Sequence, residues 1–437
     1  MNTVAFHSLG CKVNSYETDI MQQKFTENGF RVVPFTQKAD VYVINTCTVT
    51  NIADRKSRQM LHRAKTLNPD AIVIATGCYV QTDTEGVLKD ASVDIAIGNN
   101  EKTRILEILN EYVSKQKKTS SILDIMHTSE YESMMLTETA ERTRAYIKIQ
   151  DGCNQFCTYC LIPFARGPVR SREKAEILDE IKALAVKGYN EFVLTGIHVS
   201  SYGVTRPGHL EENRLAELLE DINALPEVHR IRLSSLEPRV MTEEFVQRIS
   251  ALKKLCPHFH LSLQSGCDAT LKRMNRHYTC EEFLAGVRLL RKYFDDPAIT
   301  TDVIVGFPGE TDEEFEESLK FAETVGFYEM HIFKYSKRKG TVAEKMPGQV
   351  SGVVKDARSD KMEALEHEMS VAFRKRHIGK SYSILFEEEK TVNGKKYYIG
   401  HTPEYIKVAA ISDANLSDKI ETRTLTGFLT DDILLSE

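Results

Sequence analysis

The sequence predicts an α/β protein with an N-terminal doubly wound α/β domain, a central partial (βα)6 barrel and a small C-terminal all-β domain. Up to about residue 350, short apolar runs alternate with helix-length segments. This alternation is typical of βαβ units and of a parallel sheet covered on both faces. After one long charged segment the pattern changes to short β-like runs, and a chain of 437 residues is long enough for several domains.

Residues 1–118 are expected to form the doubly wound domain. Helices are expected at 15–28, 52–67 and 101–118. The intervening apolar runs, expected as strands, are 4–6, 31–35, 41–45, 71–75 and 93–97. Residues 119–143 are polar and weakly periodic, so they are interpreted as a surface linker.

Residues 144–372 repeat the rhythm of strand and helix. Expected strands lie at 145–149, 191–195, 230–233, 258–263, 301–305 and 330–335. Six such units predict a partial barrel, because a complete one needs eight. The helix after the first strand is expected to start near Ser171 as its cap and to end at Gly188.

Residues 354–378 are interpreted as one charged helix that leads into the all-β domain, residues 373–437. Strands are expected there at 383–386, 396–399, 405–410 and 422–429. From residue 371 onward basic and acidic residues are equal in number, so this domain has no net charge.

The composition excludes a disordered chain, a collagen-like protein and a disulfide-rich scaffold. The chain has ordinary globular usage, with 41% hydrophobic and 27% charged residues. No run approaches the roughly 18 apolar residues of a membrane helix, and the N-terminus lacks a secretory signal, so a cytoplasmic protein without membrane association is expected. Nine cysteines in such a chain argue for reduced thiols, metal ligands or catalysis instead of disulfides.

Three of the cysteines are closely spaced. Cys153, Cys157 and Cys160 form a C-x3-C-x2-C run directly after the first barrel strand. Three thiolates on one loop can hold an iron–sulfur cube, which normally takes four, so one iron is left open for another ligand. The alternatives are a zinc knuckle or packing thiols. Zinc usually takes four nitrogen or sulfur ligands, and no nearby His or Cys completes the set.

Three other cysteines are dispersed: Cys11, Cys47 and Cys78 each follow an expected parallel strand. The carboxyl ends of such strands meet in one crevice, where turn amides favour anions such as thiolates. A second three-cysteine cluster is therefore predicted, with three small buried residues beside turn glycines as the alternative. The other three, Cys256, Cys267 and Cys280, lack ligand spacing and are interpreted as packing residues.

These features resemble the radical S-adenosylmethionine (SAM) superfamily and, within it, the methylthiotransferases. The resemblance covers essentially the whole chain. Its motifs are LGCKVN (9–14), NTCTVT (45–50), TGCY (76–79), IQDGCNQFCTYCLIPFARGPVRSR (149–172), LTGIH (194–198), SSLEP (234–238), LSLQSGCD (261–268), RMNRHYT (273–279) and TDVIVGFPGET (301–311).

The resemblance implies two [4Fe-4S] clusters and SAM as cofactors. It implies that the cluster of Cys153, Cys157 and Cys160 binds SAM, which is cleaved to a 5′-deoxyadenosyl radical that takes hydrogen from the substrate. The cluster of Cys11, Cys47 and Cys78 would hold sulfur, which a second SAM methylates before transfer. All six cysteines are thus metal ligands and catalytic residues by resemblance.

The resemblance also implies SAM contacts. The positions are Tyr159, Gly196, Glu237, Gln264, Arg276, Ile304 and Gly306. Near two of these positions the sequence departs from the family pattern. Ile197-His198 replaces the usual acidic end of the second-strand motif, and Glu310 stands one residue late.

Within the family, LGCKVN and the main cysteine motif are most similar to the enzymes that methylthiolate C2 of N6-threonylcarbamoyladenosine beside the tRNA anticodon. Isopentenyladenosine enzymes usually have Gln-Met where Lys12-Val13 stands, and the enzyme of a ribosomal-protein aspartate usually has Pro-Lys. Both remain alternatives. Two further classes compete: a non-catalytic iron–sulfur electron carrier, which would not require a barrel, and a zinc-dependent RNA-binding module.

The implied partner is the anticodon stem-loop of tRNA, with a reductant such as flavodoxin or ferredoxin and a sulfur donor. The C-terminal domain resembles the RNA-binding TRAM module, with Arg374, Lys375, Arg376 and Lys380 as contacts. Although the net charge is −6, basic residues follow three barrel strands and are candidates for phosphate binding. They are Arg166, Arg170 and Arg172; Lys272, Arg273 and Arg276; and Lys334, Lys337, Arg338 and Lys339.

Overall fold

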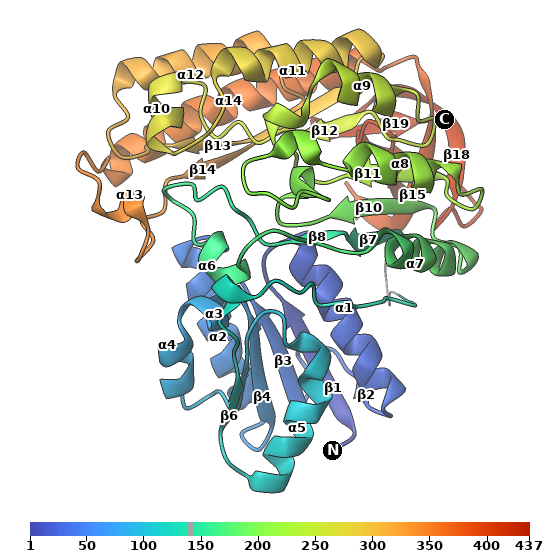
Figure 1. Cartoon of the computed structure of the whole chain (residues 1–437). Coiled ribbons are helices and arrows are strands. Elements are labelled where there is room, and N and C mark those ends of the chain that lie inside the picture. Colours follow the sequence, from blue (N-terminus) through green and yellow to red (C-terminus); the bar gives the residue numbers. More distant parts are fainter. Residues whose placement is uncertain (139–142) are drawn as a thin grey trace.

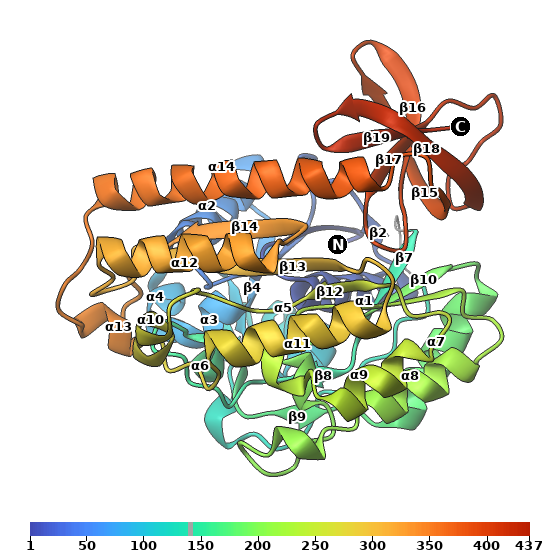
Figure 2. The ribbon, with the colours of Figure 1, turned by 90° about the horizontal axis from the view of Figure 1, so that it is seen from above.

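The computed structural model describes residues 1–138 and 143–437. An N-terminal sheet domain lies against one side of a partial barrel, and a second, small barrel lies at one end of the last long helix (Figures 1 and 2). The predicted fold class is confirmed, with a parallel sheet followed by βα units and a closed β-barrel.

The N-terminal domain is a six-stranded parallel sheet in the order β2-β1-β3-β4-β5-β6. Its apolar strands are buried on both faces: α1 and α5 pack on one and α2, α3 and α4 on the other. The strands are β1 (Thr3–Ser8), β2 (Arg31–Val32), β3 (Val41–Thr46), β4 (Ile72–Gly77), β5 (Ile95–Ile97) and β6 (Thr119–Ser121). The helices are α1 (Lys12–Glu27), α2 (Asn51–Leu67), α3 (Cys78–Thr82), α4 (Thr84–Lys89) and α5 (Ile105–Lys115).

Strand β6 corrects the expected linker at 119–143. It pairs with β5 at the sheet edge, so these polar residues are not a plain surface connection. Further along, Met134 and Leu136 are buried against Tyr16 and Ile20 of α1. A few isolated apolar residues in a polar stretch produce no periodicity, which is why the pattern did not predict them. Residues 139–142 of the expected linker lie outside the described part.

The central domain has the six expected parallel strands. Two sheets, β11-β10-β7 and β12-β13-β14, are joined by the bridges Ile231–Leu255 and Leu236–Leu261 into one open barrel. The strands are β7 (Arg144–Lys148), β10 (Glu191–Thr195), β11 (Arg230–Leu233), β12 (His258–His260), β13 (Ala298–Val305) and β14 (Glu329–Lys334). Six helices pack on the outside, in one continuous apolar core with alternate strand residues.

The covering helices are α7 (Lys174–Val186), α8 (Leu215–Ala224), α9 (Glu243–Ser250), α11 (Cys280–Tyr293), α12 (Asp312–Val325) and α14 (Gly352–Arg376). Shorter elements line the carboxyl ends of the strands: β8 (Gln150–Asp151), α6 (Ile162–Arg166), β9 (Arg170–Ser171), α10 (Asp268–Arg273) and α13 (Val342–Lys345). Gly188 follows the last turn of α7 with a φ of 95°, as predicted. The predicted cap is wrong, because Glu173 precedes α7 and the Ser171 hydroxyl accepts from the Gly203 amide instead.

The C-terminal domain is a closed barrel in the order β15-β16-β17-β19-β18. Its strands are β15 (Ser381–Val392), β16 (Lys395–His401), β17 (Lys407–Ala410), β18 (Ile420–Thr430) and β19 (Ile433–Ser436), the last not predicted. This barrel is fixed to β11, where Arg232 Nη1 donates to the Pro403 carbonyl at 2.9 Å. The Arg232 guanidinium also lies 4.6 Å from the ring centre of Tyr405. Among the described residues, no helix is long and apolar enough to cross a bilayer.

Candidate active site

The C-x3-C-x2-C run lies on a loop between β8 and α6, at the carboxyl end of the first barrel strand. Backbone bonds hold this loop: the Thr158 amide donates to the Met274 carbonyl at 3.0 Å, and the Cys153 amide to the Gly167 carbonyl at 3.0 Å. Gly152 precedes it with a φ of 76°, and a Cβ there would lie 1.8 Å from the Pro168 carbonyl oxygen. The loop can therefore fold this way only with glycine at this position.

The three thiols of this loop are partly buried and close to donors. The Ile162 amide lies 3.4 Å from Cys160 Sγ, and Arg276 Nη1 lies 3.2 Å from Cys157 Sγ. Burial raises the pKa of Cys153 to about 12. Burial, and then repulsion by a Cys157 thiolate, likewise raises the pKa of Cys160. The thiols of Cys153 and Cys160 thus lose their protons readily only to a bound cationic centre.

The sulfurs are not spaced as in a closed tetrahedral zinc site. In the described chain neither cysteine triplet has all three sulfur atoms within 4.8 Å of one another. Zinc–sulfur bonds of about 2.3 Å would bring tetrahedral ligands to about 3.8 Å apart. A cube binds each cysteine through a different iron and accepts wider spacing.

The dispersed cysteines meet at the carboxyl edge of the N-terminal sheet. Cys47 and Cys78 directly follow the neighbouring strands β3 and β4. Cys11 follows β1, which pairs with β3 on the side away from β4. Cys47 and Cys78 are buried and Cys11 is exposed. Burial, and then the charges of Cys78 and Cys11, raise the pKa of Cys47 to about 12, so the three thiols interact. Gly10 has a φ of 97°, and a Cβ there would lie 2.6 Å from Cys47 Sγ.

A buried charge cluster lies between the two cysteine sets. Arg166 is fully buried; its Nε lies 3.3 Å from Cys78 Sγ and its Nη1 2.5 Å from Glu17 Oε1. Lys102 and Lys148 also contact the Glu17 carboxylate. Asp151 adds the second carboxylate, 2.6 Å from Lys148 Nζ. This cluster joins the N-terminal domain to the loop that follows Cys160.

The predicted phosphate contacts of Arg166, Arg170 and Arg172 are wrong. All three side chains are buried, and Arg172 pairs with Glu180. Arg338 is buried as well, 2.7 Å from Asp54, and Arg374 is buried beside Glu329. Seven of the predicted RNA contacts are exposed, near the barrel mouth or beside the small barrel. They are Lys272, Lys334, Lys337, Lys339, Lys375, Arg376 and Lys380.

Several expected SAM contacts lie around the main cysteine loop. Tyr159 and Ile304 belong to one apolar cluster with Phe307. Glu237 accepts from Gln155 Nε2 at 2.9 Å and lies 2.8 Å from His198 Nε2. Although burial alone would raise it, His198 and Arg239 hold the pKa of Glu237 at about 2.

His198 is a residue that sequence reasoning did not select, although it stands where the family's acidic residue is usual. It now orients Glu237, whose other oxygen pairs with Arg239. Arg276 lies on the Cys157 side of the loop, as described above.

Glycines and backbone atoms account for the other expected SAM contacts. A Cβ at Gly196 would lie 2.9 Å from Gln150 Oε1, so the second strand end approaches the first closely. Gln264 adopts a φ of 67° and its carbonyl accepts from the Ile304 amide at 2.8 Å. The Gly306 amide donates to Glu310 Oε2 at 2.7 Å. Glu310 thus supports the strand end although it stands one residue late.

Comparison with known proteins agrees with this geometry. A family model described as the radical SAM superfamily matches residues 147–322, and one described as the uncharacterized protein family UPF0004 matches residues 3–98. The solved structure of the radical SAM methyltransferase TsrM from Kitasatospora setae covers 90% of this chain and 78% of its own, with a TM-score of 0.57 and 15% identity. That likeness shows the fold alone.

A partial barrel with a three-cysteine loop after its first strand defines the class of radical SAM proteins, whose members use a [4Fe-4S] cluster and SAM. Threonylcarbamoyladenosine tRNA methylthiotransferase MtaB of Bacillus subtilis is 41% identical over 422 residues, 96% of this chain and 93% of that protein. The tRNA-2-methylthio-N(6)-dimethylallyladenosine synthase of Pelotomaculum thermopropionicum is 32% identical over 428 residues, 96% and 94% of the two chains. The chain belongs to the radical SAM tRNA methylthiotransferase family.

Proposed function

We propose that the protein methylthiolates C2 of N6-threonylcarbamoyladenosine beside the anticodon of tRNA. The observation that carries this proposal is the 41% identity to a relative named for that activity, over nearly the whole of both chains. Methylthiolation of isopentenyladenosine is the second candidate, because relatives named for the dimethylallyl substrate are 32–34% identical. A ribosomal-protein aspartate is a third possible substrate, and an electron carrier would not need the barrel.

Each domain has a role in this proposal. Residues 1–118 would hold the second [4Fe-4S] cluster through Cys11, Cys47 and Cys78, and residues 144–372 the SAM cluster through Cys153, Cys157 and Cys160. Residues 119–143 connect them, and residues 373–437 would bind RNA. When bound, the SAM cluster supplies one-electron cleavage of SAM. Electrons would come from flavodoxin or ferredoxin and sulfur from a separate donor, in the cytoplasm where tRNA is modified.

The chain's own residues would prepare the site. Arg276 and the Ile162 amide donate toward thiolate sulfurs and stabilise their charge. Tyr159 and Ile304 would cover the adenine of SAM with apolar surface, and Glu237, kept ionised by His198 and Arg239, would accept from a cationic or N–H group. Arg166, on the helix after the main cysteine loop, would help to hold Cys78 of the second set in place.

Mass spectrometry of tRNA nucleosides from a deletion strain tests the substrate. Loss of the methylthio-threonylcarbamoyl nucleoside is expected, and loss of only the isopentenyl counterpart would contradict the proposal. Reconstituted protein should carry about eight irons, four for each cluster. One or two zinc ions per chain and no iron would contradict the proposal of two iron–sulfur clusters.

Substitution of single cysteines separates the roles of the two clusters. Cys157→Ala is expected to abolish formation of 5′-deoxyadenosine. Cys47→Ala should still cleave SAM but transfer no methylthio group. Cys256→Ala is the matched control, because this buried thiol belongs to neither set. Methylthiolation by the Cys47 variant would show that the dispersed cysteines hold no required cluster.

A further inference from the structure

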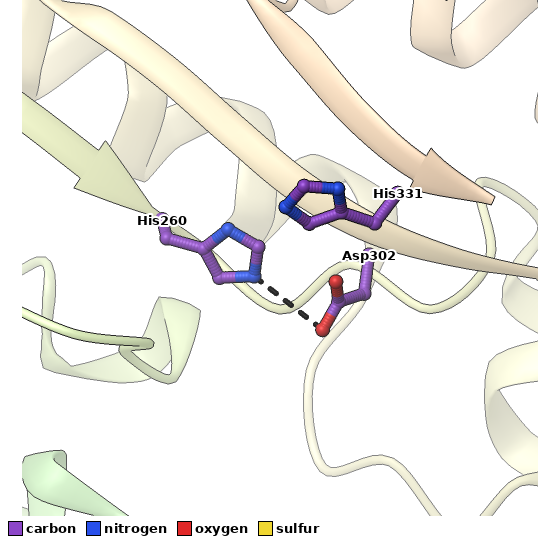
Figure 3. A group of neighbouring side chains, drawn as sticks. All are labelled: His260, Asp302 and His331. Carbon is purple, nitrogen blue, oxygen red and sulfur yellow. Dashed lines mark ion pairs between the residues drawn. The ribbon is translucent and has the colours of Figure 1, made fainter. Parts of the chain in front are cut away.

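Three polar side chains on neighbouring barrel strands have few partners within the protein. His260, Asp302 and His331, hereafter the inner-face group, come from β12, β13 and β14 and point toward one another (Figure 3). His260 Nε2 lies 3.4 Å from Asp302 Oδ2, and its ring stacks on that of His331 at 5.8 Å. His260 Nδ1 lies 3.0 Å from Thr300 Oγ1, but its Nε2 is buried without a hydrogen-bond partner, and the His331 ring beside it is exposed. A buried ring nitrogen without a partner awaits a polar ligand.

The inner-face group faces the interior of the barrel. Phe259, Val303 and Met330 belong to the core beneath the outer helices, and neighbouring strand residues point to opposite faces. Asp302 lies opposite His331 in the strand register and two residues before Ile304. Since a strand rises about 3.3 Å per residue, the group lies one step, roughly 7 Å, below the expected SAM layer. A substrate reaching that layer would meet this group.

A cation from the other domain lies near this interior. Lys12 begins α1, directly after Cys11, and lies within electrostatic range of Arg232, Arg144, Glu191 and Asp302. Both of these arginines already have carboxylate partners: Arg232 pairs with Glu191, and Arg144 with Glu387. Lys12 is exposed, and within the described residues no hydrogen bond or ion pair of its side chain is found.

The local field favours an anion over a metal cation. Two histidines and a carboxylate can bind a divalent metal. However, Lys12 lies within electrostatic range of Asp302 and adds a positive charge that opposes a divalent cation there. The unpaired ammonium and the imidazoles suit an anionic ligand with hydrogen-bonding groups.

We propose that Lys12 and the inner-face group bind the threonylcarbamoyl substituent of the substrate adenosine and set the specificity of the enzyme. Lys12 pairs with the substituent's carboxylate, while His260, Asp302 and His331 bond to its hydroxyl and amide groups. An isopentenyl group offers none of these partners and would leave the polar side chains unsatisfied, which is the condition under which polar sites reject apolar analogues most strongly. The inference rests on the proposed function and assigns its specificity residues.

Binding to the reconstituted full-length enzyme tests this inference. The probes are three anticodon stem-loops that differ only in the base beside the anticodon: threonylcarbamoyladenosine, isopentenyladenosine and adenosine. Lys12→Gln is expected to weaken binding of the threonylcarbamoyladenosine stem-loop by about 10- to 100-fold, because a hydrogen bond to a charged group is lost. The affinity for the adenosine stem-loop should not change. His331→Ala should act in the same direction, and Lys12→Arg should restore much of the loss.

Lys337→Gln is the matched control: this exposed lysine lies outside the barrel interior and should weaken all three stem-loops alike if it meets phosphate. Iron content and SAM cleavage establish that each variant retains its clusters. If the wild type methylthiolates the threonylcarbamoyl RNA but Lys12→Gln and His331→Ala bind all stem-loops as it does, the inference fails while the function stands. If the wild type modifies only isopentenyl RNA, the proposed function fails. Stoichiometric zinc or manganese bound by the wild type and lost in Asp302→Asn would overturn the inference in favour of a metal site.

Discussion

Removing the carboxylate of Glu17 is expected to destabilise the protein severely. Glu17 is 1% exposed and contacts three buried cations, Lys102, Lys148 and Arg166. Burial alone would raise its pKa, but Arg166, Lys102 and Lys148 hold the pKa well below its usual range. Glu17→Gln keeps the shape of the side chain but leaves three cations facing the single carboxylate of Asp151. Breaking a buried ion pair in this way costs about 3–5 kcal/mol.

Urea unfolding of the apoprotein, followed by circular dichroism, measures this cost. With a slope of about 2 kcal/mol per molar, the midpoint of Glu17→Gln should fall by about 2 M. Arg166→Met leaves two cations and two carboxylates, so its loss should be smaller. Glu220→Gln is the control, because the Glu220–Arg248 pair is partly exposed and worth under about 1 kcal/mol. A Glu17→Gln midpoint equal to that of the control, or above that of Arg166→Met, would refute this reasoning.

Two further predictions concern the second cysteine set and acid stability. Gly10→Ala places a Cβ against Cys47 Sγ at a φ of 97°, so reconstituted iron should fall from about eight to about four per chain while SAM cleavage persists; full iron would contradict this. Glu191 is buried, but Arg232 and Arg144 hold its pKa at about 2. Its contribution to stability is therefore complete above the unfolded value near 4.5 and is lost as the pH falls toward 2. Acid titration of Glu191→Gln should show a weaker loss over this window, and an unchanged titration would argue against the ion pair.

The sequence predicted the strands of the parallel sheets because buried parallel strands are continuous apolar runs. It also predicted the cysteine loop, since its three ligands are local in the chain. The second set needed the topology, because Cys11, Cys47 and Cys78 are neighbours only through the order of β1, β3 and β4.

Ion pairs between residues far apart in the sequence could not be predicted. Arg166 was assigned to the RNA surface, yet its partner Glu17 lies 149 residues away on a helix of another domain. The inner-face group is a similar case, because Asp302 and His331 become neighbours only when β13 and β14 pair. Strand β6 was missed because three polar residues carry no pattern, and the sheet edge alone gives them a structure.

The attachment of the small barrel has a consequence for truncation experiments. Its Tyr405 stacks on His401 at 4.5 Å and covers the guanidinium of Arg232, whose Nη1 is bound by the Pro403 carbonyl. These contacts make the C-terminal domain the floor of the central barrel. A chain shortened at its end would expose the arginines of that floor to water, and its activity on any substrate would change for reasons unrelated to RNA. The contribution of this domain to tRNA affinity is therefore measured with surface variants such as Lys380→Gln, in a chain that keeps its floor.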